Sequence, residues 1–282
     1  MRAVVSTACL AAILALLGPS ASASAQWARY PTRNVPKDAK GQPDMNAPAP
    51  RTADGKPDLS GLWRGGAGGA GRGRGAAADA PPPSGPPVAG FANVGQNIKE
   101  GLPFTPYGAE LLKTRVAGNS KDNPEAHCLP MGIIQLHTQG APRKFIQTPL
   151  ELVILYEASS ERREIFTDGR PLPSDDPQPW FNGYSVGRWD GDTLVVETVQ
   201  FRDGGWLDIN GSPLTDAGKV TERFRRPTFG RMEIDVTIED KKAYTKPFSV
   251  RVNQSLMLDE ELLEFVCLEN QRFGPEPGAP KK

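Results

Sequence analysis

Residues 202–208 combine acidic and aromatic side chains in a pattern that could support chemistry on a small molecule. Asp203 and Asp208 lie on either side of Trp206 and two glycines. A sugar or polyol ring can stack on a tryptophan while one carboxyl group donates a proton and a second acts as the base. Asp203 and Asp208 are therefore candidate catalytic residues. The competing interpretation is a plain hairpin connection in which Trp206 plugs one end of a barrel.

Glu222 and His137 are further acid–base candidates. Glu222 shares one face of an expected strand with Phe224, so its carboxyl group would point where apolar side chains point. A carboxyl group in such a place is either paired with an arginine or functional, and the sequence leaves both alternatives open. His137 and His127 are the two histidines of the chain, and no activated nucleophile lies near either in the sequence.

Residues 168–184 form a second candidate region, because they make a long, proline-rich connection between two expected strands. Long connections in compact domains are often functional. Aromatic rings there could stack on a ligand, and an arginine could hold a substrate anion. The candidate ligand-binding residues are Arg163, Asp168, Arg170, Trp180, Tyr184, Trp189 and Trp206.

Several chemical classes have no support in the sequence. The chain carries no P-loop, no GxGxxG after a strand, no GxSxG elbow and no HExxH. Cys128 follows His127 without the spacing of a zinc site, so neither a metal nor a cofactor is predicted. With 33 basic and 33 acidic residues, the chain offers no electrostatic reason to bind nucleic acid. The expected partner is a small-molecule ligand or substrate.

Residues 1–25 predict a secretory signal peptide. Arg2 supplies a positive start, residues 8–17 are apolar, and residues 23–25 are small, as a cleavage site requires. The apolar run is too short to span a bilayer, which takes about 20 residues, and no second stretch reaches that length. We expect cleavage near Ala25, a secreted or periplasmic mature chain, and no integral membrane segment.

Two cysteines, Cys128 and Cys267, remain after removal of the signal peptide. In an oxidising compartment an even pair favours a disulfide, with two buried free thiols as the alternative. A bond that closes a loop of roughly 140 residues contributes about 4–5 kcal/mol in the chain-entropy model.

The local patterns predict one helix followed by many short strands. Thr105 is a good helix N-cap, Pro106 suits the first helical position, and Gly118 ends the helix. From Lys144 onward, apolar and polar residues alternate between turn signals. The expected strands cover residues 145–148, 150–157, 163–167, 184–189, 193–201, 220–226, 232–238, 248–252 and 263–268.

These elements define the expected organisation. The chain divides into a signal peptide (1–25), an extended segment with a turn repeat (26–63), a Gly/Pro/Ala-rich linker (64–90), a helix and loop (91–143), a β domain (144–270) and a disordered tail (271–282). The fold class is all-β, an antiparallel meander that forms a calycin- or lipocalin-like barrel or half-barrel with one N-terminal helix. A β-sandwich is the alternative. Gly61 and Trp63 resemble the Gly-x-Trp that opens many lipocalin barrels.

Longer motifs resemble a large group of secreted bacterial β-rich proteins. The motifs are GYSVGRWDGDTLVVET at residues 183–198, DGKPDLSGLW at 54–63, VTERFRR at 220–226 and KKAYTKPF at 241–248. The resemblance covers roughly residues 51–270. It implies one secreted β domain and carries over no activity and no catalytic residue.

Three functional interpretations follow from these observations. The first is a secreted or periplasmic β-barrel that binds a small aromatic, apolar or sugar-like ligand. The second is a metal-independent lyase or hydrolase that uses paired carboxyl groups as acid and base. The third is an envelope structural protein without a small-molecule site.

The disulfide gives the first testable prediction. Thiol titration of the denatured, unreduced mature protein should find no free thiol, because Cys128 and Cys267 are expected to be bonded to each other. Titration after reduction, which should find two thiols, is the control. Two reactive thiols before reduction would contradict the pairing.

Overall fold

The computed structural model describes residues 30–65, 85–174 and 178–267. The chain forms two units, Met1–Pro31 and Thr32–Lys282, and the fold described below is that of the second. The expected signal peptide (1–25), the expected tail (271–282) and most of the expected linker (residues 66–84) lie outside the described residues.

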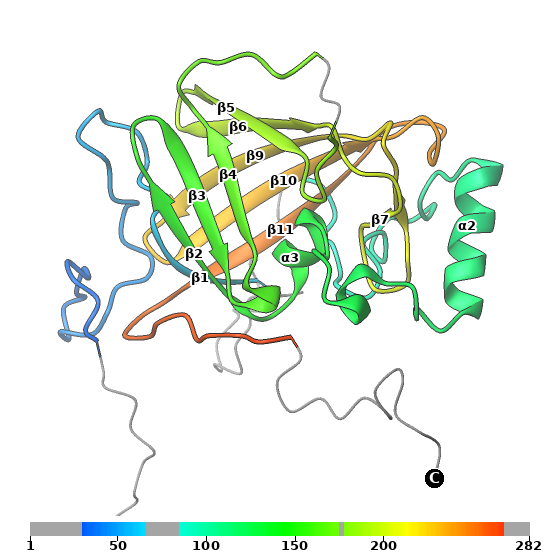
Figure 1. Cartoon of the computed structure of the whole chain (residues 1–282). Helices are drawn as coiled ribbons and strands as arrows, with labels where there is room; N and C mark the ends of the chain where they lie inside the picture. The colour runs from blue at the N-terminus through cyan, green and yellow to red at the C-terminus, as the bar shows by residue number, and fades with distance from the viewer. Residues whose placement is uncertain (1–29, 66–84, 175–177, 268–282) are drawn as a thin grey trace, which may run out of the picture. The chain divides into compact units, whose positions relative to one another are not determined.

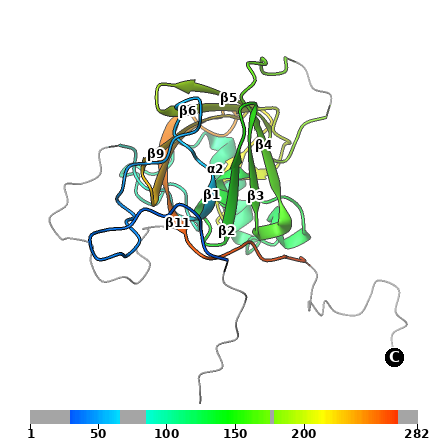
Figure 2. The ribbon, with the colours of Figure 1, turned by 90° about the vertical axis from the view of Figure 1, so that its left-hand side faces the viewer.

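A closed barrel of nine strands dominates the described residues (Figures 1 and 2), so the expected all-β barrel with one long helix is confirmed. The strands are hydrogen-bonded in the order β1-β11-β10-β9-β6-β5-β4-β3-β2. Their bounds are β1 Gly61–Gly65, β2 Pro142–Gln147, β3 Glu151–Tyr156, β4 Arg162–Phe166, β5 Tyr184–Asp190, β6 Thr193–Val199, β9 Lys219–Thr228, β10 Arg231–Glu239 and β11 Phe248–Met257.

Alternation of apolar and polar residues explains why these strands close on themselves. In β10, Met232, Ile234, Val236 and Ile238 are fully buried, and the residues between them are partly or fully exposed. A sheet with one apolar face must cover that face, and closure into a barrel does so without leaving a free edge.

One joint of the barrel departs from the expected antiparallel meander. β4 and β5 run parallel and share two residue pairs, Ile165 with Ser185 and Phe166 with Val186. All the other neighbouring strands of the barrel are antiparallel. A parallel pair needs a long connection, and residues 167–183 provide it.

The barrel is closed by β1, which the sequence analysis had assigned to an extended segment and the start of a linker. β1 pairs with β11 on one side and with β2 on the other. Trp63 on this strand is fully buried, and its indole N–H donates to the Leu59 carbonyl at 3.1 Å. β1 ends at Gly65, so this strand crosses the boundary expected between residues 63 and 64.

Two helices precede most of the barrel strands. α2 (Pro106–Ala117) begins as expected, with the Thr105 hydroxyl accepting from the Gly108 amide at 3.1 Å. α3 (Ile133–Thr138) was missed, because all six of its residues are buried and it shows no polar stripe. Figure 1 shows α3 at the end of the barrel that faces α2. Shorter elements are η1 Pro124–His127, η2 Ala158–Ser160, β7 Gly205–Trp206 and β8 Pro213–Leu214.

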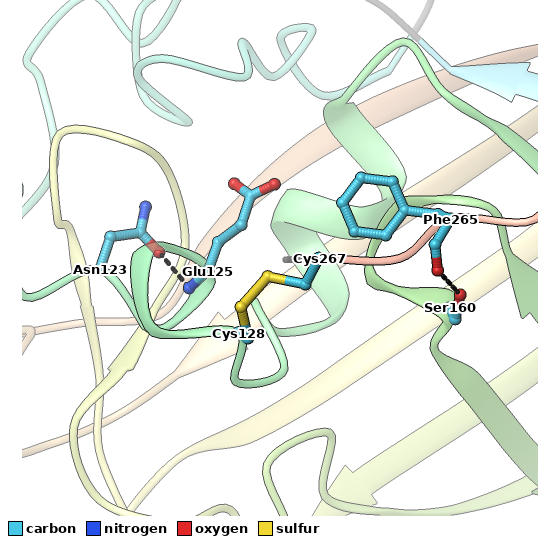
Figure 3. Close-up of a disulfide and its surroundings, with 6 residues drawn as sticks. All are labelled: Asn123, Glu125, Cys128, Ser160, Phe265 and Cys267. Atoms are coloured by element: carbon cyan, nitrogen blue, oxygen red, sulfur yellow. Dashed lines mark hydrogen bonds between the residues drawn. A yellow bond between two sulfur atoms is a disulfide. The ribbon is translucent and has the colours of Figure 1, made fainter. Parts of the chain in front are cut away.

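The predicted disulfide between Cys128 and Cys267 is present, with 5.8 Å between the two Cα atoms (Figure 3). It fastens the segment after β11 to the turn after η1. The Ser160 hydroxyl donates to the Phe265 carbonyl of the same segment at 2.6 Å (Figure 3). The strand expected over residues 263–268 is wrong, since residues 260–266 have no regular structure. None of the helices in the described residues is both long and apolar enough to cross a membrane.

The close approach of β1 to α3 gives the second prediction. A methyl group on Gly65 would lie 2.3 Å from the His137 carbonyl oxygen and 2.7 Å from Nη1 of Arg143. Arg143 Nη1 donates to that same carbonyl at 2.7 Å, so neither neighbour can move without breaking the bond. We expect Gly65→Ala to lower the free energy of unfolding by about 1–3 kcal/mol in a urea titration.

Gly140→Ala is the matched control. A methyl group there meets nothing within 4 Å, so its unfolding free energy should stay within about 0.5 kcal/mol of the parent. Equal stability of both variants would show that β1 and α3 are not packed this closely.

Candidate functional site

A cleft of about 450 Å³ opens beside the parallel joint of the barrel, and we call it the β4–β5 cleft. Residues 159–164, 166 and 180–185 form most of its wall, with Cys128, Leu129 and Pro130 at one side. The cleft lies where β4 and β5 share two residue pairs, and residues 180–183, which directly precede β5, line it.

Three of the predicted ligand-binding residues, Arg163, Trp180 and Tyr184, line the cleft. Trp180 is 52% exposed, and its backbone is fixed by hydrogen bonds to residues 200 and 202. Arg170 donates to the Tyr184 hydroxyl at 3.2 Å, and Asp168 holds the Arg170 side chain at 2.6–2.9 Å. Three of the seven predicted residues thus line the cleft, and Arg170 and Asp168 form a hydrogen-bonded chain that leads to one of them, Tyr184.

Trp189 and Trp206 lie outside this set. Trp189 on β5 packs against the core, with the Lys56 ammonium 5.9 Å from its ring centroid. Trp206 is 2% exposed, and the Arg115 guanidinium covers its ring at 4.6 Å. Arg115 also donates to the carbonyls of residues 204, 205 and 211, so this contact stabilises the loop that the acidic residues occupy.

Asp203 and Asp208 have different surroundings. Asp208 is fully buried, and its carboxylate accepts from the backbone amides of Val94, Gly211 and Ser212 at 2.8–3.0 Å. Asp203 is exposed. The bonds of Asp208 fix the 208–212 turn and tie the segment around Val94 to it.

The barrel interior contains a buried ionic network around Glu222. Glu222 on β9 forms two hydrogen bonds with Arg163 on β4, of which Nη1 to Oε1 measures 3.0 Å, and one with Nε2 of His137 at 3.0 Å. Arg163 also donates to Ser185 at 3.1–3.2 Å and to Thr198 at 2.9 Å. Of the two alternatives that the sequence left open, Glu222 is thus the carboxylate paired with an arginine.

The charges in this network follow from its geometry. Burial alone would raise the pKa of Glu222, but the Arg163 charge and the hydrogen bonds from His137 and Arg163 outweigh burial and lower the pKa to about 2. For His137, burial dominates over the bond to Glu222 and lowers its pKa. The neutral imidazole of His137 therefore donates Nε2–H to the ionised Glu222. Arg163 also lines the cleft, so it connects the buried network to the cleft wall.

Glu161 is one of the residues of this site that the sequence analysis missed, along with Phe166, Phe181 and Asn182. It is 9% exposed and lines the cleft, where its carboxylate accepts from the Met131 amide at 2.9 Å and from Asn182 Nδ2 at 2.7 Å. Burial raises the pKa of Glu161 more than these two bonds lower it. Asn182 Oδ1 is buried without a hydrogen-bond donor in the part of the chain that is described.

The alternatives to this site would be a second cleft or a metal centre. A second cleft of about 600 Å³ is lined by residues 97–101 and 246–249 among others, and none of the predicted site residues lies in it. Within residues 30–65, 85–174 and 178–267, no three His, Cys, Asp or Glu side chains come together as a metal site would require.

No protein-family model, curated protein or solved structure matches the chain.

The buried network gives the third prediction. Glu222→Gln removes the charge that compensates Arg163, which leaves a guanidinium ion buried and unpaired. We expect the free energy of unfolding at pH 7 to fall by about 3–5 kcal/mol, measured by urea titration. Glu197→Gln on the neighbouring strand is the control. Glu197 pairs at the surface with Arg188 and Lys219, so its loss should cost about 1 kcal/mol or less.

Glu222→Gln should also change how the free energy of unfolding depends on pH in the acidic range. Since the pKa of Glu222 lies below its ordinary value of 4.5, its contribution is complete above pH 4.5 and is lost as the pH falls through about 2. The parent should therefore lose more stability over this interval than Glu222→Gln does. Parallel acid profiles for the two proteins would contradict the assignment of an ionised Glu222.

Proposed function

We propose that the protein binds a small aromatic, apolar or sugar-like ligand in the β4–β5 cleft. The observation that carries this proposal is the wall of the cleft, where Phe166, Trp180, Phe181 and Tyr184 surround a few polar groups. Small-molecule sites are typically concave, mostly apolar and aromatic, with a small number of placed polar groups. Aromatic faces also suit the flat sides of sugar rings.

We place the ligand at the barrel wall rather than inside the barrel. A lipocalin-like protein would hold its ligand in the barrel interior. Here large buried side chains occupy that interior, among them Phe145, Phe224 and the ionic network of Arg163. The β4–β5 cleft lies at the barrel wall, and Arg163 belongs both to its lining and to the network inside the barrel.

The disulfide supports an extracellular or periplasmic location for this activity. Disulfides persist in oxidising compartments and are rare in the cytosol. The bond between Cys128 and Cys267 agrees in this respect with the signal peptide expected over residues 1–25.

An acid–base enzyme receives less support from the same geometry. Such an enzyme needs two carboxyl groups that face one reacting molecule. Asp208 is committed to three backbone amides, and Asp203 is exposed outside the residues that line the cleft. Glu222 is paired with Arg163 inside the barrel.

Binding of 2-phenylethanol, a neutral aromatic probe, tests the proposal. Titration of the mature protein followed by amide NMR should shift resonances of residues 159–164 and 180–185. Trp180→Ala should weaken binding roughly threefold to tenfold, because one aromatic contact is lost. Trp189→Ala is the matched control, since Trp189 is outside the cleft, and it should bind like the parent. An unchanged affinity in Trp180→Ala, or no binding by the parent, would contradict the proposal.

A further inference from the structure

We infer that the ligand of the β4–β5 cleft carries a protonated amine, held by the Glu161 carboxylate and the Asn182 amide oxygen beside the aromatic wall. The inference rests on the proposed function and specifies the chemical class of the ligand. Four observations support it: the pairing of charges, the unused hydrogen-bond acceptors, the cations already seated on aromatic rings and the burial of Glu161.

Among the charged side chains that line the cleft, one carboxylate, that of Glu161, has no ion-pair partner in the described residues. Four charged side chains line the cleft, namely Glu161, Arg162, Arg163 and Glu164. Arg162 lies 3.6 Å from Glu164 in an exposed pair, and Arg163 is bound to Glu222 inside the barrel. Glu161 makes no ion pair within the described residues, although it is 9% exposed. A buried carboxylate needs a compensating charge, and a cationic ligand would provide one.

The hydrogen-bond acceptors point to the same ligand chemistry. Each carboxylate oxygen of Glu161 accepts one hydrogen bond, whereas a carboxylate can accept about four in total. Asn182 Oδ1 is buried with no donor among the described residues. Both groups can therefore accept further hydrogen bonds, and an ammonium group has three donors and no acceptor. A ligand anion would bring only further acceptors to this place.

The aromatic wall already holds cations on its rings. The Arg170 guanidinium lies 3.8 Å from the centroid of Phe166, and that of Arg202 lies 5.0 Å from the centroid of Phe181. The faces of aromatic rings attract cations because the π-electron density there is negative, and tryptophan is the strongest partner. Trp180, 52% exposed at the cleft, supplies the ring type best suited to a ligand cation.

The burial of Glu161 makes its carboxylate responsive to a bound cation. Burial raises the pKa of Glu161, and the nearby Glu125 carboxylate raises it further. An ammonium group beside Glu161 opposes both effects and favours the ionised form. In the free site Glu161 thus has no ion-pair partner among the described residues, and an amine would supply one.

Three probes of equal ring structure test the inference on the full mature protein. Isothermal titration at pH 7.5 compares 2-phenylethylamine, a cation, with 2-phenylethanol, which is neutral, and phenylacetate, an anion. The amine should bind at least about tenfold more tightly than the alcohol, since hydrogen bonds to a charged group are stronger than neutral ones. Phenylacetate should bind most weakly of the three.

Two variants test whether Glu161 causes the preference for the amine over the alcohol. Glu161→Gln should reduce the preference for the amine over the alcohol to about twofold or less, while the affinity for the alcohol stays within about twofold. Glu164→Gln is the matched control, because Glu164 lines the same cleft but is paired with Arg162. It should keep the preference of the parent.

The outcomes separate the inference from the proposed function. If the alcohol or phenylacetate binds as tightly as the amine, the inference is overturned and the proposed function stands. If none of the three binds, the proposed function itself fails. A preference that persists in Glu161→Gln also overturns the inference. The comparison of probes on the parent protein needs no variant and decides the matter even if Glu161→Gln does not fold.

Discussion

The interaction on which the rest of this structure depends is the ion pair between Arg163 and Glu222 inside the barrel. Both side chains are almost completely buried, so each ion would be costly without the other. The pair joins β4 to β9 across the interior and binds His137 of α3 as well. Together with Phe145 and Phe224 it fills the barrel interior, and the β4–β5 cleft lies at the barrel wall beside Arg163.

The strand pattern allowed most of the barrel to be predicted from the sequence. In β9 and β10 alternation is regular, because one face of each strand meets the core and the other is more exposed. The exceptions have physical causes. β1 is short and surrounded by glycine, and its closing role depends on distant partners, β2 and β11. α3 is buried on all sides, so it has no polar stripe to reveal a helix.

The sequence predicted part of the aromatic wall of the candidate site, Trp180 and Tyr184, but neither Phe166 nor Phe181. Trp180 and Arg170 belong to a long, proline-rich connection that ends where Tyr184 begins β5, and long connections are often functional. Glu161 gave no such signal, because its importance comes from burial beneath the chain around Met131 and from its contact with Asn182. Asp203 and Asp208 illustrate the reverse case, since two acidic residues five positions apart in the sequence occupy different environments in the fold.

The pairing of β1 with β11 has a consequence for the order in which the molecule folds. Leu62 pairs with Met257, so the first strand of the barrel finds one of its partners only when nearly the whole chain is present. Contacts between distant segments form slowly, because a long loop must close first. β9, β10 and β11 can associate early as neighbours in sequence. Cys267 follows β11 in the chain, so the disulfide with Cys128 can form only when nearly the whole chain is present.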